Sequence, residues 1–206
     1  MRDFTASEIL RVVGKRGYKT FIRGKYNLNI VGVRSANSES DKFDDAVCVV
    51  FQDEDEVWRI RQYKCTTDPG KHWLLNPLNI NGTLIMKPGQ YRGAYKIGVH
   101  GRSGKYPYKA LEQYEVMEYV RDNNRNSRLD FSLFEEDKNI IEGIFKTNIH
   151  RASKWKSTYN IGKYSAGCQV IQDPKDFDEF MNLCEKQIKF GHGNSFTYTL
   201  IEEKDI

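Results

Sequence analysis

The sequence predicts an α+β fold that is mainly β, with one helix near each end of the chain. Two amphipathic patterns with helix start signals flank a long central stretch, in which short alternating or wholly apolar segments are separated by turns. Many strands with few helices between them favour a sandwich-like mixed or antiparallel sheet. The length of 206 residues suits one β-rich domain, so we expect a single domain over residues 1–206.

Both helices have readable start signals. Thr5 can cap the first helix, and Glu8 completes a capping box before an apolar stripe that ends ahead of Gly17. Asp173 and Pro174 are typical of the cap and first position of the last helix.

Strand patterns account for much of the remaining chain. We expect strands at about 26–33, 46–51, 58–61, 83–86, 95–99, 115–121, 143–150 and 195–201. The segment at about 66–104 is rich in Gly, Pro and Asn, and we expect long loops there around two short strands. Such a segment is more typical of a binding rim than of a linker.

Composition and charge exclude several functions. The net charge of +4 over 206 residues, with acids interleaved among the bases, is too small for a dedicated nucleic-acid surface. The longest apolar run, 46–51, is too short to span a bilayer. Four scattered histidines without an H-E-x-x-H motif give no zinc site, and we expect neither a metal nor a cofactor. The first residues lack the apolar stretch of a secretory signal, so we expect synthesis in a cytoplasm.

One of the four cysteines stands in a setting that suggests reactivity. Cys48 and Cys184 fall within apolar patterns typical of buried elements, and Cys65 carries no signal either way. Cys168 follows Ser165, Ala166 and Gly167 and precedes a short apolar strand. Small residues let a backbone approach a substrate closely, and successive N–H groups in such a turn can bind an oxyanion.

A thiol nucleophile needs a base within reach, and His150 is the best candidate. Alternation in 143–150 places Lys146, Asn148 and His150 on one polar face. The polar segment 151–164 is typical of a loop, and we expect it to join two adjacent strands. His150 and Cys168 would then lie side by side.

A histidine closing a strand, a polar loop, and Ser-x-Gly-Cys opening the next strand resemble the catalytic region of the L,D-transpeptidases, a family with the YkuD-like fold. The match runs from His150 to Val170, and the Ser-Ala-Gly-Cys-Gln segment is similar to phage-borne relatives. The resemblance implies a mainly β sandwich with a mixed sheet. It also implies a Cys–His mechanism on peptidoglycan stem peptides, in which an acyl-enzyme is passed to an amine or to water.

The resemblance also implies roles for individual residues. Cys168 would be the nucleophile and His150 the base, Ser165 and Gly167 would shape the turn, and amides near Gly167 and Cys168 would form the oxyanion hole. The expected substrate-binding residues are Gln169, His100 and Tyr164. A phage lysis protein or virion could deliver such an enzyme to the cell wall without a signal peptide.

A second hypothesis remains open because the motif departs from the family. Ala166 stands where the family usually has His, and Val170 stands where it usually has Asn or Arg. A non-catalytic cell-wall-binding protein or a virion structural protein, with a vestigial Cys168, is the alternative.

Overall fold

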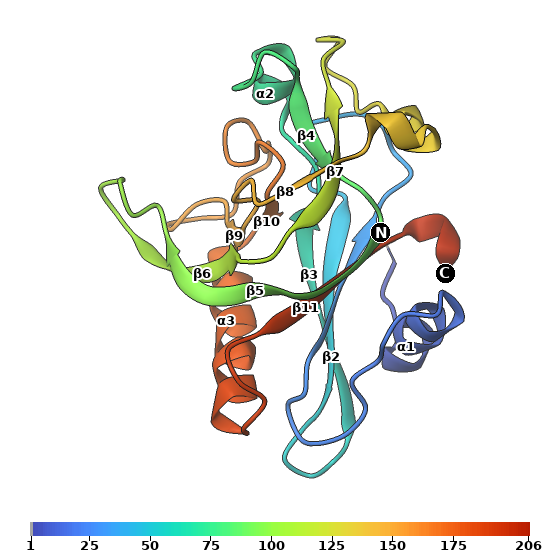
Figure 1. Ribbon diagram of the computed structural model, residues 1–206. Helices are drawn as coiled ribbons and strands as arrows, with labels where there is room; N and C mark the ends of the chain where they lie inside the picture. Colours follow the sequence, from blue (N-terminus) through green and yellow to red (C-terminus); the bar gives the residue numbers. More distant parts are fainter. Residues whose placement is uncertain (1) are drawn as a thin grey trace.

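The computed structural model describes residues 2–206, and it confirms the mainly β fold (Figure 1). The helices are α1 (Ala6–Lys15), α2 (Lys71–Leu75) and α3 (Pro174–Lys189). The strands are β1 (Asn29–Arg34), β2 (Asp45–Gln52), β3 (Trp58–Thr66), β4 (Thr83–Met86), β5 (Gly89–His100), β6 (Tyr108–Gln113), β7 (Met117–Asp122), β8 (Ile141–Gly143), β9 (Ile149–Arg151), β10 (Gln169–Ile171) and β11 (Phe196–Glu202). Short 3-10 turns lie at Phe131–Glu135, Asp137–Asn139 and Glu203–Asp205.

The main sheet is mixed, as expected, but it closes into a barrel where a sandwich was expected. Its strand order is β1-β11-β5-β6-β9-β10-β3-β2, while β4, β7 and β8 form a separate three-stranded sheet. The pairs β1/β11 and β9/β10 are parallel, and the other pairs are antiparallel. Closure depends on β5, which pairs with β11 through its first part and with β6 through its second. Gly93, with φ +62, lies where the β5/β11 register shifts, and a bulge there lets one sheet curl.

Helix caps follow the sequence signals closely. The Thr5 side chain accepts a hydrogen bond from the Glu8 amide, and the Glu8 side chain accepts one from the Thr5 amide, which completes the capping box of α1. Asp173 caps α3 through the Lys175 amide, with Pro174 in the first turn. These predictions are confirmed because capping depends on residues only a few positions apart.

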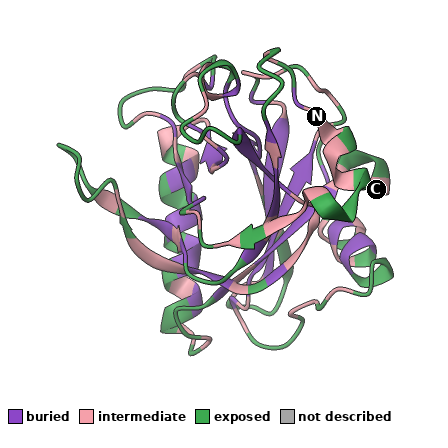
Figure 2. Cartoon of the chain, turned by 45° about the horizontal axis from the view of Figure 1, so that its top comes forward, coloured by how far each residue is buried: buried purple, intermediate pink, exposed green. Residues whose placement is uncertain are grey.

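The two long helices pack on opposite faces of β2, and both faces of that strand are buried (Figures 1 and 2). Val47, Val49 and Phe51 join the main core, to which α3 contributes Phe177 and Phe180. The alternate residues of β2 join a second cluster, built with α1. The continuous apolar run at 46–51 is thereby explained.

Three parts of the chain differ from the sequence expectations. The segment at 66–104 contains α2 and the whole of β5, and β6 had no recognised pattern. Residues 144–148 are not a strand, so the expected strand at 143–150 is wrong in its middle. Lys146 has φ +63, which breaks the alternation that placed it on one face with His150.

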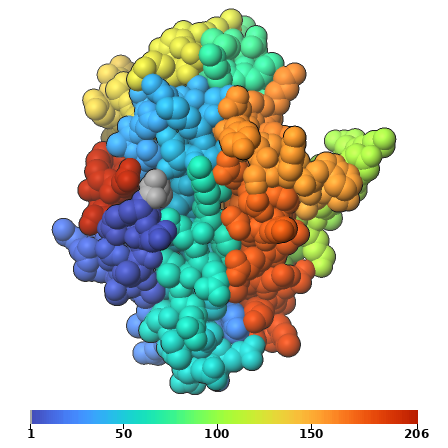
Figure 3. All heavy atoms as spheres, turned by 180° about the vertical axis from the view of Figure 1, so that it is seen from behind, coloured from blue at the N-terminus to red at the C-terminus, as the bar shows by residue number. Residues whose placement is uncertain are grey.

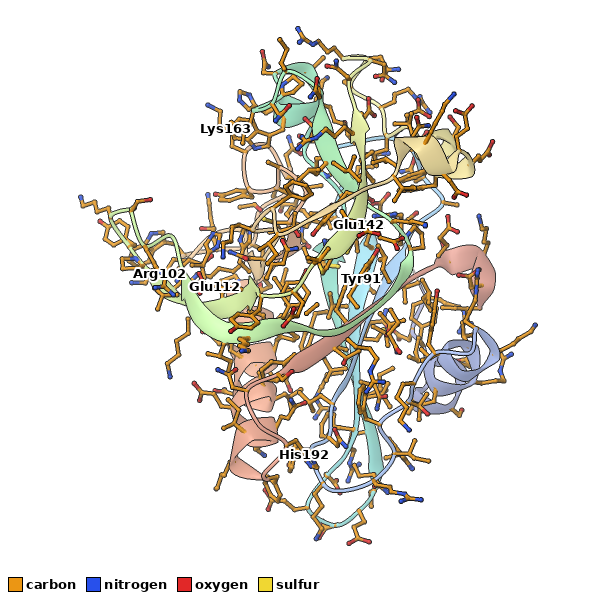
Figure 4. The ribbon with its side chains drawn as sticks, viewed as in Figure 1. Tyr91, Arg102, Glu112, Glu142, Lys163 and His192 are labelled. Atoms are coloured by element: carbon orange, nitrogen blue, oxygen red, sulfur yellow. The ribbon has the colours of Figure 1, made fainter. Side chains whose placement is uncertain are left out.

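The β5–β6 hairpin extends away from the barrel, and its tip projects past the loop of residues 152–168 (Figure 3). Arg102 at the tip donates to Glu112 on β6 at 2.9 Å, which ties the tip to its own strand (Figure 4). In residues 2–206, the helices are all too short or too polar to cross a membrane.

Candidate active site

His150 lies on β9, and Cys168 directly precedes β10; these two strands are adjacent and parallel. In the register of β9 and β10, His150 pairs with Val170, and the Gln169 amide donates to the Asn148 carbonyl at 3.0 Å. Cys168 packs against a small cluster that contains Val170 and also Ala152, two residues beyond His150. Side chains two residues apart on a strand point to one face. The cysteine and the histidine therefore share one face of the sheet, offset by two residues along the strands.

The loop of residues 152–168, which connects β9 to β10, is anchored at several points. The Gly162 amide donates to Asp41 Oδ1 at 2.5 Å, and Trp73 Nε1 donates to the Lys163 carbonyl at 3.1 Å (Figure 4). The Gly70 amide donates to the Ser165 carbonyl at 2.9 Å. These contacts hold the end of the loop that leads into Cys168 against the start of α2 and against the loop that contains Asp41.

Ser165 and Gly167 fold the turn before the cysteine. Ser165 is fully buried, and its hydroxyl donates to the Cys168 carbonyl at 2.8 Å and accepts from the Gly167 amide at 3.2 Å. Gly167 has φ +119, and a Cβ added there would lie 2.9 Å from the Leu84 carbonyl oxygen. The Gly167 amide was one of two expected to bind an oxyanion, but it already donates its hydrogen bond to the Ser165 hydroxyl. The Cys168 amide has no hydrogen-bond partner within residues 2–206.

His150 is buried, with 4% of its surface exposed, and its ring is oriented by the backbone. Nδ1 lies 2.8 Å from the Arg151 carbonyl oxygen. A carbonyl can only accept, so Nδ1 carries the proton and Nε2 is left as the basic nitrogen. Burial lowers the pKa of His150 to about 3, and the neighbouring His100 adds to this effect. The imidazole is therefore neutral near pH 7.

His100 stacks on His150 instead of lying alone at the mouth of a groove. The two rings are 4.2 Å apart and nearly parallel, at 16°. Asn148 Nδ2 donates to His100 Nδ1 at 3.1 Å, and Asn148 Oδ1 accepts from the Gln113 amide at 2.9 Å. Asn148 and His100 thus form a hydrogen-bonded group packed against the His150 ring. Sequence analysis recognised neither this group nor the stacking, because His100 and His150 come from separate parts of the chain.

Gln113 is a further residue that sequence analysis missed. Its buried side chain accepts from the amides of Phe145 and Thr147 at 3.0 and 3.1 Å, and donates to the Gly143 carbonyl at 2.9 Å. One glutamine therefore supplies hydrogen bonds that a neighbouring strand would otherwise give to residues 143–147. The same contacts fix Lys146 between its neighbours in a left-handed conformation.

The sulfur of Cys168 faces a groove. Cys168 is half-buried and lines a cavity of about 400 Å³, together with residues 78–79 and 82–84, Arg121, Phe145–Thr147 and Ala166. Its thiol donates to the Lys146 carbonyl at 3.7 Å, and no hydrogen bond joins it to His150 among the described residues. Burial raises the pKa of the Cys168 thiol to about 11, and the backbone of Asn148 offsets part of this rise. The resting pair is a neutral thiol beside a neutral imidazole.

Two of the expected substrate-binding residues lie in different surroundings. Gln169 is fully buried, and its Oε1 accepts from the Tyr198 hydroxyl at 2.9 Å inside the barrel. Gln169 does not line the groove, so in this structure its side chain is not placed to contact a substrate there, as had been expected. Tyr164 is 41% exposed, and a hydrogen bond between its backbone and the His150 ring favours the charged imidazole, which opposes the lowering of the His150 pKa by burial.

The other three cysteines lie away from the groove that Cys168 lines. Cys48, Cys65 and Cys184 are all buried. Within residues 2–206, no three His, Cys, Asp or Glu side chains are grouped closely enough to hold a metal ion. Comparisons with protein-family models, with curated proteins and with solved structures found no match to this chain.

Proposed function

We propose that this protein is a cysteine-dependent peptidase or transpeptidase of the L,D-transpeptidase kind, acting on peptidoglycan stem peptides. A phage cell-wall enzyme delivered by lysis or by a virion is the setting that suits it best, and the cell wall is then its place of action. Hydrolysis is the simpler outcome for such an enzyme, because transfer needs a second site that favours an acceptor amine over water.

The observation that carries the proposal is the shared face of His150 and Cys168 on paired parallel strands, with the sulfur at a groove. The Arg151 carbonyl supports it further, since it places the proton of the neutral imidazole on Nδ1 and so leaves Nε2 unprotonated and able to take a proton. A nucleophile, a base and a third group that orients the base are the arrangement that nucleophilic catalysis needs.

The neutral resting pair determines the order of proton transfer. As Sγ attacks the scissile carbonyl carbon, its proton passes to His150 Nε2, and the new C–S bond leaves negative charge on the carbonyl oxygen. The free Cys168 amide is the donor available to that oxygen. Collapse of the intermediate breaks the C–N bond, and the leaving amine takes the proton from His150. Water or an amine then attacks the thioester and restores the thiol.

For this sequence of steps, the Cys168 thiol has to rotate from the Lys146 carbonyl toward His150. Catalytic hydrogen bonds are often long or unformed before substrate binds. A positioned base contributes roughly 10²–10⁴-fold to such a reaction, so His150→Ala should reduce turnover strongly while the fold is retained.

Intact-mass measurements test the proposal directly. The protein is incubated with a carbapenem, which acylates cysteines of this family, and separately with muropeptides whose products are identified by mass spectrometry. We expect one carbapenem adduct at Cys168 and cleaved or exchanged stem peptides, both absent in Cys168→Ser and strongly reduced in His150→Ala.

His72→Gln is the matched control, because His72 lies in α2 and does not contact the pair. It should behave as the wild type does. If Cys168 forms no adduct and muropeptides stay intact in the wild type, the enzymatic proposal is wrong. Muropeptide binding without turnover would then favour the non-catalytic cell-wall-binding alternative.

A further inference from the structure

The groove beside Cys168 carries positive charge without any acidic residue to balance it. Arg121 and Lys146 both line it, and no Asp or Glu does. Neither cation forms an ion pair with any acid in residues 2–206. Many Lys and Arg side chains elsewhere in the protein do form such pairs. The absence of acids leaves the groove suited to an anion.

Arg121 is held in place for such a role. It lies on β7 opposite Leu84, and its Nη1 donates to the Gly82 carbonyl at 2.9 Å. Its guanidinium lies over the Phe145 ring, 5.4 Å from the ring centre. These two contacts use one N–H group and one face of the guanidinium. The other N–H groups remain for a ligand, and a guanidinium suits a carboxylate.

Lys146 lines the same groove and lies next to Cys168. Its carbonyl accepts from the Cys168 thiol, so its backbone is next to the reactive sulfur. Its side chain is exposed and lines the same groove. The left-handed backbone at Lys146, held by Gln113 through the flanking amides, turns that residue out of the strand alternation. A backbone held in this way commonly marks a functional site.

We propose that Arg121 and Lys146 form a subsite for a carboxylate of the acyl donor, close to the carbonyl that Cys168 attacks. This inference rests on the proposed function, and it narrows the substrate class. The preferred donor is a stem peptide with a free carboxylate near the scissile bond, and the matching carboxamide is a poorer donor. The two cations act as specificity-determining residues, and the proton transfers do not involve them.

Two alkylating reagents of nearly equal size provide a test that needs no turnover. Iodoacetate carries a carboxylate, whereas iodoacetamide carries a neutral amide in its place. In both reactions the sulfur forms a bond to the CH₂ carbon and iodide leaves. At a single pH, we measure by intact mass how fast each reagent modifies Cys168, and divide the rate with iodoacetate by the rate with iodoacetamide. This ratio is then divided by the same ratio for free glutathione, which gives the quotient used below. The thiolate fraction cancels in that quotient.

The expected quotient for the wild type is well above one. Arg121→Gln and Lys146→Gln should each lower it by about fivefold or more, since each removes a unit charge close to the bound carboxylate. Sodium chloride at about 1 M should lower it as well, because the screening length then falls to roughly 3 Å. Arg92→Gln is the matched control: Arg92 lines a different cavity, and its removal should leave the quotient unchanged.

A wild-type quotient near one, or a quotient that neither variant changes, overturns the subsite. Lys146→Gln keeps the test valid if Arg121→Gln fails to fold, because Lys146 is exposed. Muropeptide turnover with a quotient near one refutes the subsite alone. A high quotient that depends on Arg121, without any turnover, refutes the proposed reaction and leaves the carboxylate subsite in place.

Discussion

Replacing Gln113 by Met should destabilise the protein much more than a single side chain on a β-strand normally does. Met has a similar length and no amide, so Gln113→Met removes every hydrogen bond while filling the same space. The Thr147 amide is buried and loses its only acceptor, at 3.1 Å. The Phe145 amide and the Gly143 carbonyl lose their partners too, but both residues are half-buried and water can reach them. The two remaining side-chain bonds add little, because Glu115 is exposed to water and the Thr147 hydroxyl keeps its bond to the Tyr119 hydroxyl.

The size of the effect follows from these contacts. An unsatisfied buried group costs about 1–3 kcal/mol, so one fully buried amide and two that water reaches in part should cost about 3 kcal/mol together. Urea unfolding measures the change. For an m-value of about 2–3 kcal/mol per M, the unfolding midpoint should fall by roughly 1–1.5 M. The rate at which Cys168 is alkylated should change in the same variant, because the Lys146 carbonyl that holds the thiol is no longer fixed.

Gln52→Met is the control. Gln52 ends β2 and makes one long bond, 3.3 Å, to the Glu56 carbonyl, so its loss should cost less than about 0.5 kcal/mol. A Gln113→Met protein that unfolds at the same urea concentration as Gln52→Met would refute the argument that one glutamine replaces a neighbouring strand at residues 143–147.

Three further predictions concern the site itself. The pKa of His150 is about 3 when folded and about 6.5 when unfolded, so its neutral form contributes stability that is lost as the pH falls below 6.5. Urea unfolding between pH 4 and 7 should therefore show the wild type losing up to about 1.4 kcal/mol per pH unit relative to His150→Gln, and parallel curves would contradict this. Gly167→Ala should lower the melting temperature and block carbapenem labelling because its φ is +119, whereas Gly14→Ala, in α1 with free space around it, should be neutral or stabilising. Because the pKa of Cys168 is about 11, its rate of alkylation by iodoacetamide should rise about tenfold per pH unit from 7 to 9, and a plateau below pH 8 would indicate a thiolate–imidazolium pair instead.

The sequence predicts best those elements whose causes are local. The capped helices α1 and α3 follow from Thr5, Glu8, Asp173 and Pro174, and the buried strand β2 follows from its apolar run. The barrel could not be predicted in this way. Its closure depends on a bulge opposite Gly93 and on β5 pairing both with β6, the next strand, and with β11 near the C-terminus, about 100 residues away. Neither feature has a signal within a short window of residues.

In the candidate site, too, the features with local causes are predicted from the sequence, and those that depend on distant strands are not. The strand pairing that brings His150 and Cys168 to one face follows from a polar loop between two short strands, and the sequence predicted that loop. The stacking of His100 on His150 depends on β5, β6 and β9 being neighbours in the barrel. Gln169 follows Cys168 and was expected at the groove, but its side chain accepts a hydrogen bond from the Tyr198 hydroxyl inside the barrel. The side chain of a polar residue beside Cys168 can point into the groove or into the barrel, and the sequence alone does not distinguish these two orientations.

The connection between β9 and β10 has a consequence for how this scaffold can change over evolution. His150 precedes this connection and Cys168 ends it, and strand pairing and the Ser165 turn set the positions of both residues. The middle of the connection exposes Trp155 and Tyr159 to solvent and is tied down mainly by bonds of Ser157 and Thr158 to the start of α3 and to Gln172. The middle of this connection can therefore change in length or chemistry while the pairing of β9 with β10 keeps His150 and Cys168 on one face of the sheet.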